Sequence, residues 1–186
     1  MPAEERFFIT SFHVITGGPG SGKTTLIDAL AAAGFARTIE AGRAIIQDQT
    51  AIDGPALPAR DPGLFAELML SWELQSYRSA QAQVGPVFFD RGVPDIAGYY
   101  RLIGHTVPPH VTAAANRFRY NRRVFAAPPW PEIFGHDAER KQTFNEAVRT
   151  FEAVTGAYRD LGYELVPLPL VPVLQRVKFV LDAIGQ

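Results

Sequence analysis

One short segment carries the residue types and the spacing of a phosphate-binding loop. It matches the pattern G-x-x-x-x-G-K-[ST] and consists of Gly17, Gly18, Pro19, Gly20, Ser21, Gly22, Lys23, Thr24 and Thr25. Glycines let the backbone N–H groups point inward, where side chains would block a phosphate. We expect Lys23 to reach the β- and γ-phosphates and the Thr24 hydroxyl to ligate Mg²⁺. The segment therefore predicts a site for ATP and Mg²⁺, with GTP left open.

The second candidate is the pair Asp90–Arg91, which follows the short apolar run Val87–Phe89. In a protein with a phosphate-binding loop, an acid at the end of a buried strand can bind Mg²⁺ or accept a hydroxyl proton. The alternative is a capping Asp before a turn. Arg91 is a candidate for stabilising the transferred phosphate, and a structural ion pair is an equally open interpretation.

Three further residues are candidates for contacting an acceptor molecule beside the phosphate donor. Glu40 ends a predicted strand, Arg43 lies one turn later, and Asp95 precedes Tyr99 and Tyr100 by one helical turn. The alternatives are a surface acid, an ordinary arginine at a helix start, and tyrosines that belong to the core.

Other charged and aromatic residues allow two interpretations each. Arg140 and Lys141 open a helix that we expect from Asp137, where the helix dipole disfavours cations unless a phosphate is bound. The alternative is a solvated helix face. Trp130 either stacks on a nucleobase or covers the end of the sheet. A basic cluster, formed by Arg117, Arg119, Arg122 and Arg123, is expected to be a solvated edge.

The elements that position these residues alternate between strand and helix. Strands are predicted at 12–16, 36–40, 87–90, 120–126 and 163–168, and helices at 26–33, 42–49, 61–84, 94–103, from 108, 137–161 and 171–184. Such alternation indicates an α/β fold, a parallel sheet with helices on both faces. Ligands bind beyond the carboxyl ends of parallel strands, so the phosphate-binding loop, Glu40, Asp90, Arg91 and Trp130 should converge.

Composition limits the function classes. The 186 residues favour one domain spanning 1–186, and the net charge of −1 offers no general basic surface for nucleic acid. The absence of cysteine excludes disulfides and cysteine chemistry. The first residues lack the pattern of a signal peptide, and no apolar stretch of about 18 residues occurs. We therefore predict a cytoplasmic protein without a membrane span, and its oligomeric state stays open.

Several motifs taken together resemble the NadR-like P-loop ATPase/kinase domain family. They are Val14–Thr25, Phe89–Gly92 with Asp95, Phe125–Trp130, Asp137–Lys141 and Leu161–Leu165. These AAA-type P-loop NTPases are related to ribosylnicotinamide kinases and to nucleoside and nucleotide kinases. The resemblance implies a three-layer fold with five strands in the order 2-3-1-4-5. It also implies a lid at about 128–145 that carries Arg140, and an Asp-Arg motif in which Asp90 is the acid.

Two functions remain in view. The first is an ATP- and Mg²⁺-dependent kinase acting on an unidentified small acceptor, with Lys23, Asp90, Arg91 and Arg140 as catalytic residues. The alternative is a regulatory NTPase, a nucleotide-dependent switch without a small acceptor. Binding of nucleic acid by the basic cluster is disfavoured by the net charge and by its predicted position.

Overall fold

A five-stranded, all-parallel sheet forms the centre of the protein, in the order β2-β3-β1-β4-β5. The computed structural model describes residues 8–135 and 143–186. The strands are β1 (Phe12–Gly17), β2 (Ala36–Arg37), β3 (Val87–Asp90), β4 (Arg123–Ala127) and β5 (Glu164–Pro167). The α/β class and the strand order implied by the resemblance are therefore confirmed.

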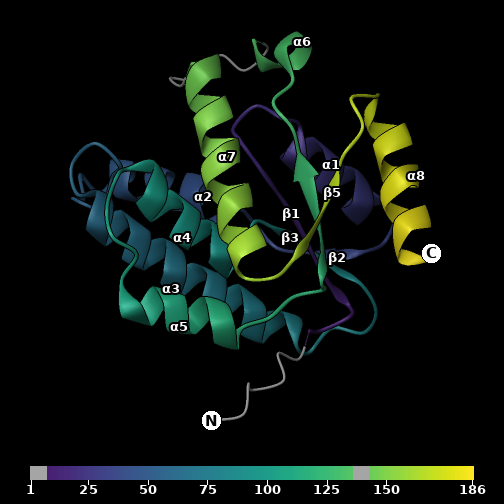
Figure 1. Ribbon diagram of the computed structural model, residues 1–186, viewed down its shortest axis with the longest axis horizontal. Helices are drawn as coiled ribbons and strands as arrows, with labels where there is room; N and C mark the ends of the chain where they lie inside the picture. The colour runs from purple at the N-terminus through teal and green to yellow at the C-terminus, as the bar shows by residue number, and fades with distance from the viewer. Residues whose placement is uncertain (1–7, 136–142) are drawn as a thin grey trace.

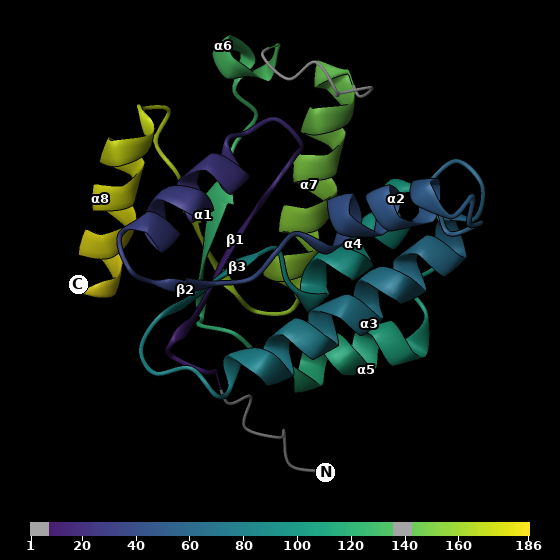
Figure 2. The ribbon, with the colours of Figure 1, turned by 180° about the vertical axis from the view of Figure 1, so that it is seen from behind.

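Helices cover both faces of the sheet. They are α1 (Lys23–Ala32), α2 (Ala41–Ala51), α3 (Pro62–Ala80), α4 (Val93–Leu102), α5 (Pro109–Arg117), α6 (Pro131–Phe134), α7 (Phe144–Asp160) and α8 (Val173–Ile184). Helices α1 and α8 lie together on one face, and α3, α4, α5 and α7 lie on the other (Figure 1). The reverse view in Figure 2 shows the same division. None of the described helices is long and apolar enough to span a membrane.

Alternation along the strands produces two cores. Phe12 and Val14 of β1 and Phe89 of β3 pack toward α3, α4 and α7. Ile15 and Phe88 point the opposite way and pack against Leu26, Leu30 and Val180 of α1 and α8. Because both faces of these strands are buried, the strands are continuous apolar runs, as expected for a parallel sheet.

Several predicted elements differ from the observed ones at their ends, and two of these differences concern residues expected at the site. The second strand is shorter than expected: it consists of Ala36 and Arg37, and its bonding to β3 ends where the Thr38 N–H donates to the Phe88 carbonyl oxygen at 2.9 Å. The long helix after β4 begins at Phe144 because Thr143 caps it, with the Thr143 hydroxyl accepting from the Glu146 N–H at 3.2 Å. The expected cap at Asp137 was therefore wrong for this helix. The segment 136–142, with Arg140 and Lys141, lies outside the described residues.

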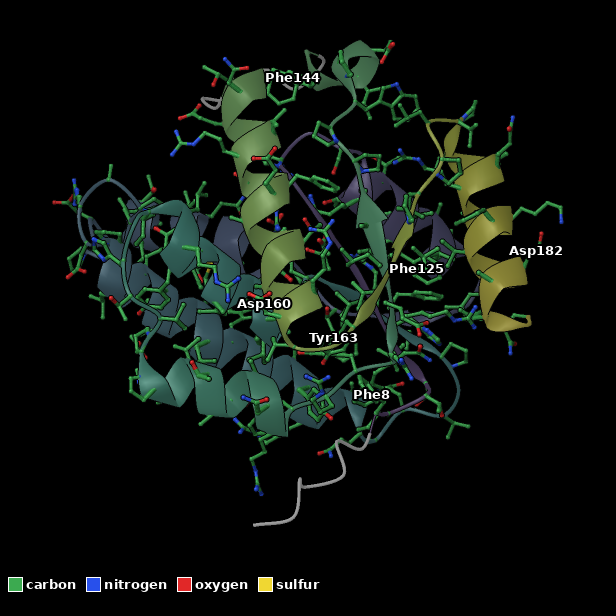
Figure 3. All side chains as sticks on the ribbon, in the orientation of Figure 1. Phe8, Phe125, Phe144, Asp160, Tyr163 and Asp182 are labelled. Atoms are coloured by element: carbon green, nitrogen blue, oxygen red, sulfur yellow. The ribbon has the colours of Figure 1, made fainter. Side chains whose placement is uncertain are left out.

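The basic cluster is only partly a solvated edge. Arg122 is exposed and pairs with Glu164 at 3.1 Å. Arg119 is buried, and its guanidinium lies 4.6 Å from the ring centre of Phe8 and 4.1 Å from that of Tyr163. Figure 3 labels both of these aromatic residues below the sheet. Arg119 was expected at a solvated edge, and its burial in the core corrects that expectation. Stacking on two aromatic rings stabilises the guanidinium there.

One buried histidine makes the fold sensitive to acid. His13 of β1 is 5% exposed, and its ring lies 5.7 Å from that of Phe88. Burial, and then the charge of Arg123, lowers the pKa of His13 from 6.5 to about 4. The unfolded chain therefore binds a proton in this pH range that the folded chain does not bind.

The free energy of unfolding should fall as the pH falls from 6.5 toward 4, and His13 should add no further loss below that. The pKa shift corresponds to on the order of 3 kcal/mol. Urea unfolding of the wild type and of His13→Leu at several pH values measures this contribution as the difference between the two curves. The exposed His105, replaced by leucine, is the control. Equal pH dependence in wild type and His13→Leu would contradict the assignment.

Candidate functional site

The phosphate-binding loop joins β1 to α1 at the carboxyl edge of the sheet. Gly17 (φ 142°) and Gly22 (φ 78°) have positive φ values that residues with a side chain rarely adopt. A Cβ atom on Gly17 would overlap the Ala127 carbonyl oxygen, and one on Gly18 would overlap the Ala147 carbonyl oxygen. The loop is therefore held between the end of β4 and helix α7, with the N-terminus of α1 directed at the space where a phosphate would bind.

Lys23 is buried inside this loop. Its side chain is 6% exposed, and its ammonium donates to the Gly18 carbonyl oxygen at 2.7 Å and to Ser21 Oγ at 3.4 Å. Burial, and then the charge of Arg91, lowers the pKa of Lys23 to about 8. An unpaired buried cation is costly, so a bound phosphate would stabilise the charge of Lys23.

Thr24 and Asp90 form a pair that fits a magnesium ion. The Thr24 hydroxyl donates to Asp90 Oδ2 at 3.2 Å, while the other oxygen, Oδ1, is buried and has no partner in the described residues. Burial, and then the Glu40 carboxylate, raises the pKa of Asp90 to about 6. No group of three or more acidic or histidine side chains within 8–135 and 143–186 forms a metal site by itself. A hydroxyl and one carboxylate suit Mg²⁺, which takes its remaining ligands from water and substrate phosphates.

Arg91 connects the loop to the end of β2. Its Nη1 donates to the Gly17 carbonyl oxygen at 2.9 Å and to Asp95 Oδ1 at 3.1 Å, and its Nε donates to Glu40 Oε1 at 3.1 Å. The backbone of Arg91 has a φ of 73°, which is unusual for a residue with a side chain. Three acceptors thus hold this guanidinium at the edge of the site, and the ion pair considered from the sequence is present.

Asp95 is fully occupied by hydrogen bonds. One carboxylate oxygen accepts from Thr16 Oγ1 at 2.6 Å and from Arg91, and the other accepts from the Gly92 N–H at 3.0 Å and the Tyr158 hydroxyl at 2.7 Å. The side chain is 4% exposed. Contact between Asp95 and an acceptor molecule stays a prediction. In this geometry the Asp95 carboxylate helps to orient the Arg91 guanidinium.

Glu40 lies beside Arg91, and Arg43 lies one turn later on α2. Burial works to raise the pKa of Glu40, but the charges of Arg91 and Lys23 hold it below its ordinary value. Glu40 is therefore a carboxylate at neutral pH. Arg43 is exposed, and its charge also acts on Glu40. The structure thus brings Glu40, Asp90 and Arg91 together beside the phosphate-binding loop.

Sequence reasoning missed Arg176. This residue of α8 is 2% exposed, and its guanidinium donates to the Ser21 carbonyl oxygen and to the Pro169 carbonyl oxygen, both at 2.8 Å. The same guanidinium lies 4.6 Å from the ring centre of Trp130. Arg176 therefore ties the phosphate-binding loop to the segments that follow β4 and β5. The sequence signal that could have identified Arg176 is its charge on an otherwise apolar helix stripe, formed by Val173, Val177 and Val180.

Arg176→Met should destabilise the fold by about 2–3 kcal/mol, because two carbonyl groups lose a charged donor and Trp130 loses its partner. Urea unfolding measures this change. The control is Lys178→Met on the same helix, whose exposed ion pair with Asp182 contributes little. If the two variants unfold at the same urea concentration, Arg176 does not support the loop.

A cavity of about 760 Å³ runs along the free edge of β2, between α2 and α3. Trp72, Gln75 and Gln49 line it, as does Thr38, whose hydroxyl accepts from the Asp90 N–H at 3.1 Å. None of its lining residues belongs to the phosphate-binding loop. We therefore place the candidate site at the carboxyl edge of the sheet and not in this cavity.

Comparison with protein families identifies the chain. A family model described as an AAA domain matches residues 12–176. The chain belongs to this AAA domain family. The phosphate-binding loop of this AAA domain is thus a P-loop, and the resemblance to AAA-type P-loop proteins is confirmed. A search of curated proteins gives no match.

Three solved structures share the fold of this AAA domain. A deoxyadenosine kinase from M. mycoides with products dCMP and dCDP bound has a TM-score of 0.66 at 12% identity, covering 94% of this chain and 98% of its own. The same kinase with bound dATP has a TM-score of 0.58 at 10% identity, covering 94% of this chain and 100% of its own. The NadR protein in complex with NR has a TM-score of 0.69 at 18% identity, covering 95% of this chain and 52% of its own. The AAA domain therefore spans about half of that NadR chain. These likenesses establish the fold.

Proposed function

We propose that this AAA domain is an ATP- and Mg²⁺-dependent kinase, acting as a single domain on a small nucleoside-, nucleotide- or vitamin-like molecule. The hydrogen-bonded link from the P-loop through Arg91 to Glu40 carries this proposal. A switch needs only to bind and hydrolyse its nucleotide. A kinase needs fixed charges between a phosphate donor and a neighbouring acceptor, and the link joins those two sides.

On the donor side, the P-loop N–H groups and Lys23 would bind the phosphates of ATP. Thr24 and Asp90 would hold Mg²⁺, which neutralises developing charge on the phosphates when it is bound. The unpartnered Asp90 Oδ1 supports this role, since a buried oxygen without a donor suits a cation.

On the acceptor side, the Glu40 carboxylate would orient the attacking hydroxyl and take its proton. The acceptor oxygen forms a bond to the γ-phosphorus, while the bond between that phosphorus and the β–γ bridging oxygen breaks. Arg91, held by Asp95, would stabilise the charge on the transferred group. Arg43 would contact the acceptor molecule. Arg140, in a lid at about 128–145, would add a further positive charge beside the transferred phosphate. Arg140 itself lies outside the described residues.

The kinds of molecule bound by the similar proteins support a nucleoside-like acceptor. The deoxyadenosine kinase structures contain dCMP, dCDP or dATP, and the NadR structure contains NR. The proposal is tested by incubating the protein with ATP, Mg²⁺ and separate nucleosides, nucleoside monophosphates and vitamin-like alcohols. Formation of a phosphorylated acceptor supports it. Hydrolysis of ATP that no acceptor stimulates would instead support the regulatory NTPase.

A further inference from the structure

A buried acid near the site has no use in the mechanism above. Glu73 lies on the inner stripe of α3, between Met69 and Tyr77, and is 2% exposed. Its carboxyl makes no hydrogen bond or ion pair with any group in the described parts of the chain. Burying a carboxyl without a partner costs several kcal/mol on transfer scales. A buried polar group without a partner in the protein calls for an explanation, and contact with a bound molecule is one.

A second buried polar group without a partner lies along the same pair of helices. The Tyr99 hydroxyl of α4 has no hydrogen-bond partner among the described residues. The Tyr99 ring packs edge-on against Phe65 of α3, with ring centres 5.5 Å apart. Phe65 and Glu73 are eight residues apart on one stripe of α3, which is about 12 Å along a helix. The seam between α3 and α4 therefore contains two polar groups that lack partners.

The inner end of this seam lies close to the acceptor side of the site. The charges of Asp95, Asp90, Arg91 and Glu40 all act on the Glu73 carboxyl. Gly42 of α2 packs on the same stripe of α3: a Cβ there would be 3.6 Å from Met69 Sδ, 3.7 Å from Phe65 Cζ and 4.0 Å from Glu40 Oε1. The Glu40 carboxylate therefore lies beside Met69, which is one helical turn from Glu73 on this stripe.

We propose that Glu73 selects the acceptor by pairing with a neutral edge that has a hydrogen-bond donor next to an acceptor. Carboxamides and the amino edges of adenine and cytosine have this chemistry. This inference rests on the proposed kinase function and adds the class of substrate to it. The phosphorylated hydroxyl lies at the other end of the same molecule, beside Glu40.

The electrostatics of Glu73 agree with a neutral partner. Burial, and then the carboxylates of Asp95 and Asp90, raises the pKa of Glu73 well above its ordinary value. A protonated carboxyl donates through its O–H and accepts through its C=O, which complements such an edge. A carboxylate on the ligand would instead meet the negative charges of Asp90 and Asp95 and should be rejected.

The test uses phosphoryl transfer from ATP with Mg²⁺ by the wild type, Glu73→Gln and Glu73→Leu. The compounds are adenosine, cytidine and nicotinamide riboside, with nicotinic acid riboside as the carboxylate analogue and glycerol as an alcohol without the edge. Glutamine keeps a neutral donor and acceptor in the same shape, whereas leucine keeps only volume. Glu67→Gln is the matched control on α3, because that half-buried side chain bonds Tyr100 and His110.

The wild type should phosphorylate at least one of the three neutral compounds and discriminate against the carboxylate analogue. Glu73→Leu should lower kcat/KM for that compound roughly 10²-fold or more through the KM of the acceptor and not of ATP. Glu73→Gln should stay within about tenfold of wild type, since it keeps both hydrogen bonds. Leucine should also raise the Tm, because an unpaired polar group leaves the core.

Three results separate failure of this inference from failure of the proposed function. If Glu73→Leu matches wild type in kcat/KM, or if it lowers the Tm and weakens ATP use equally, Glu73 is structural and the inference is wrong. If only glycerol or the carboxylate analogue is phosphorylated, the inference is also wrong but the kinase proposal stands. If no compound is phosphorylated while ATP is hydrolysed, the kinase proposal itself fails.

Discussion

Replacement of Lys23 by methionine should lower the rate of phosphoryl transfer roughly 10²–10³-fold, as expected when one preorganised donor to a developing charge is removed. Lys23 is the only P-loop side chain with a positive charge, and it is buried among backbone groups that a phosphate would face. Methionine keeps most of the apolar stem, so the fold should persist. Steady-state kinetics with ATP and a phosphorylated acceptor measure the loss.

The fold of Lys23→Met should be no less stable than the wild type. Burial lowers the pKa of Lys23 to about 8, so its charged form destabilises the ligand-free fold, and the fold gains stability above this pH as the charge is lost. Thermal unfolding at pH 7 should therefore show an equal or higher Tm for the variant. Lys178→Met is the control for loss of an exposed lysine. Full nucleotide binding and full turnover by Lys23→Met would contradict the donor site.

Asp90→Asn should separate the binding of ATP from its dependence on Mg²⁺. Asparagine preserves the shape of the side chain and can still accept from Thr24, but it offers a metal only a neutral oxygen. We expect Mg²⁺ to tighten ATP binding to the wild type and to have little effect on the variant. Turnover should fall roughly 10²-fold. Calorimetric titration of ATP with and without Mg²⁺ measures the first effect.

The role of Asp90 is distinguished from that of a general base by the same titration. A base alone would lower turnover while leaving the Mg²⁺-dependent affinity for ATP intact, and that result would show that Asp90 does not hold the metal. Asp160→Asn provides the control, because Asp160 forms an exposed pair with Arg101 far along α7. Its ATP affinity and turnover should equal those of the wild type.

Much of the fold, and the gathering of several candidate site residues at one edge of the sheet, could be predicted because the signals are local. The P-loop spacing lies within nine consecutive residues, and the short apolar run before Asp90 identifies β3. In a parallel sheet, residues that follow strands meet at one edge, so the sequence predicts Glu40 and Arg91 beside the loop. The structure brings these two side chains to within 3.1 Å.

The remaining residues depend on contacts between distant parts of the chain. Arg176 bonds the carbonyl oxygen of Ser21 across 155 positions, and nothing in the local spacing of α8 specifies that partner. The acceptor role of Asp95 stays a prediction, but its hydrogen bonds to Thr16 and Tyr158 join positions 79 and 63 residues apart, which local spacing does not specify. Glu73 gave one sequence signal, an acid on an apolar stripe, which resembles an ordinary surface residue until the helix is packed.

The most direct test of the proposed function is transfer of a radioactive γ-phosphate from ATP to a separate acceptor. Wild-type protein with Mg²⁺ and the nucleoside panel should form a labelled nucleoside phosphate, and Lys23→Met should form it at a rate roughly 10²–10³-fold lower. Release of all the label as inorganic phosphate, at a rate that no acceptor changes, would contradict the proposal that this P-loop serves a kinase.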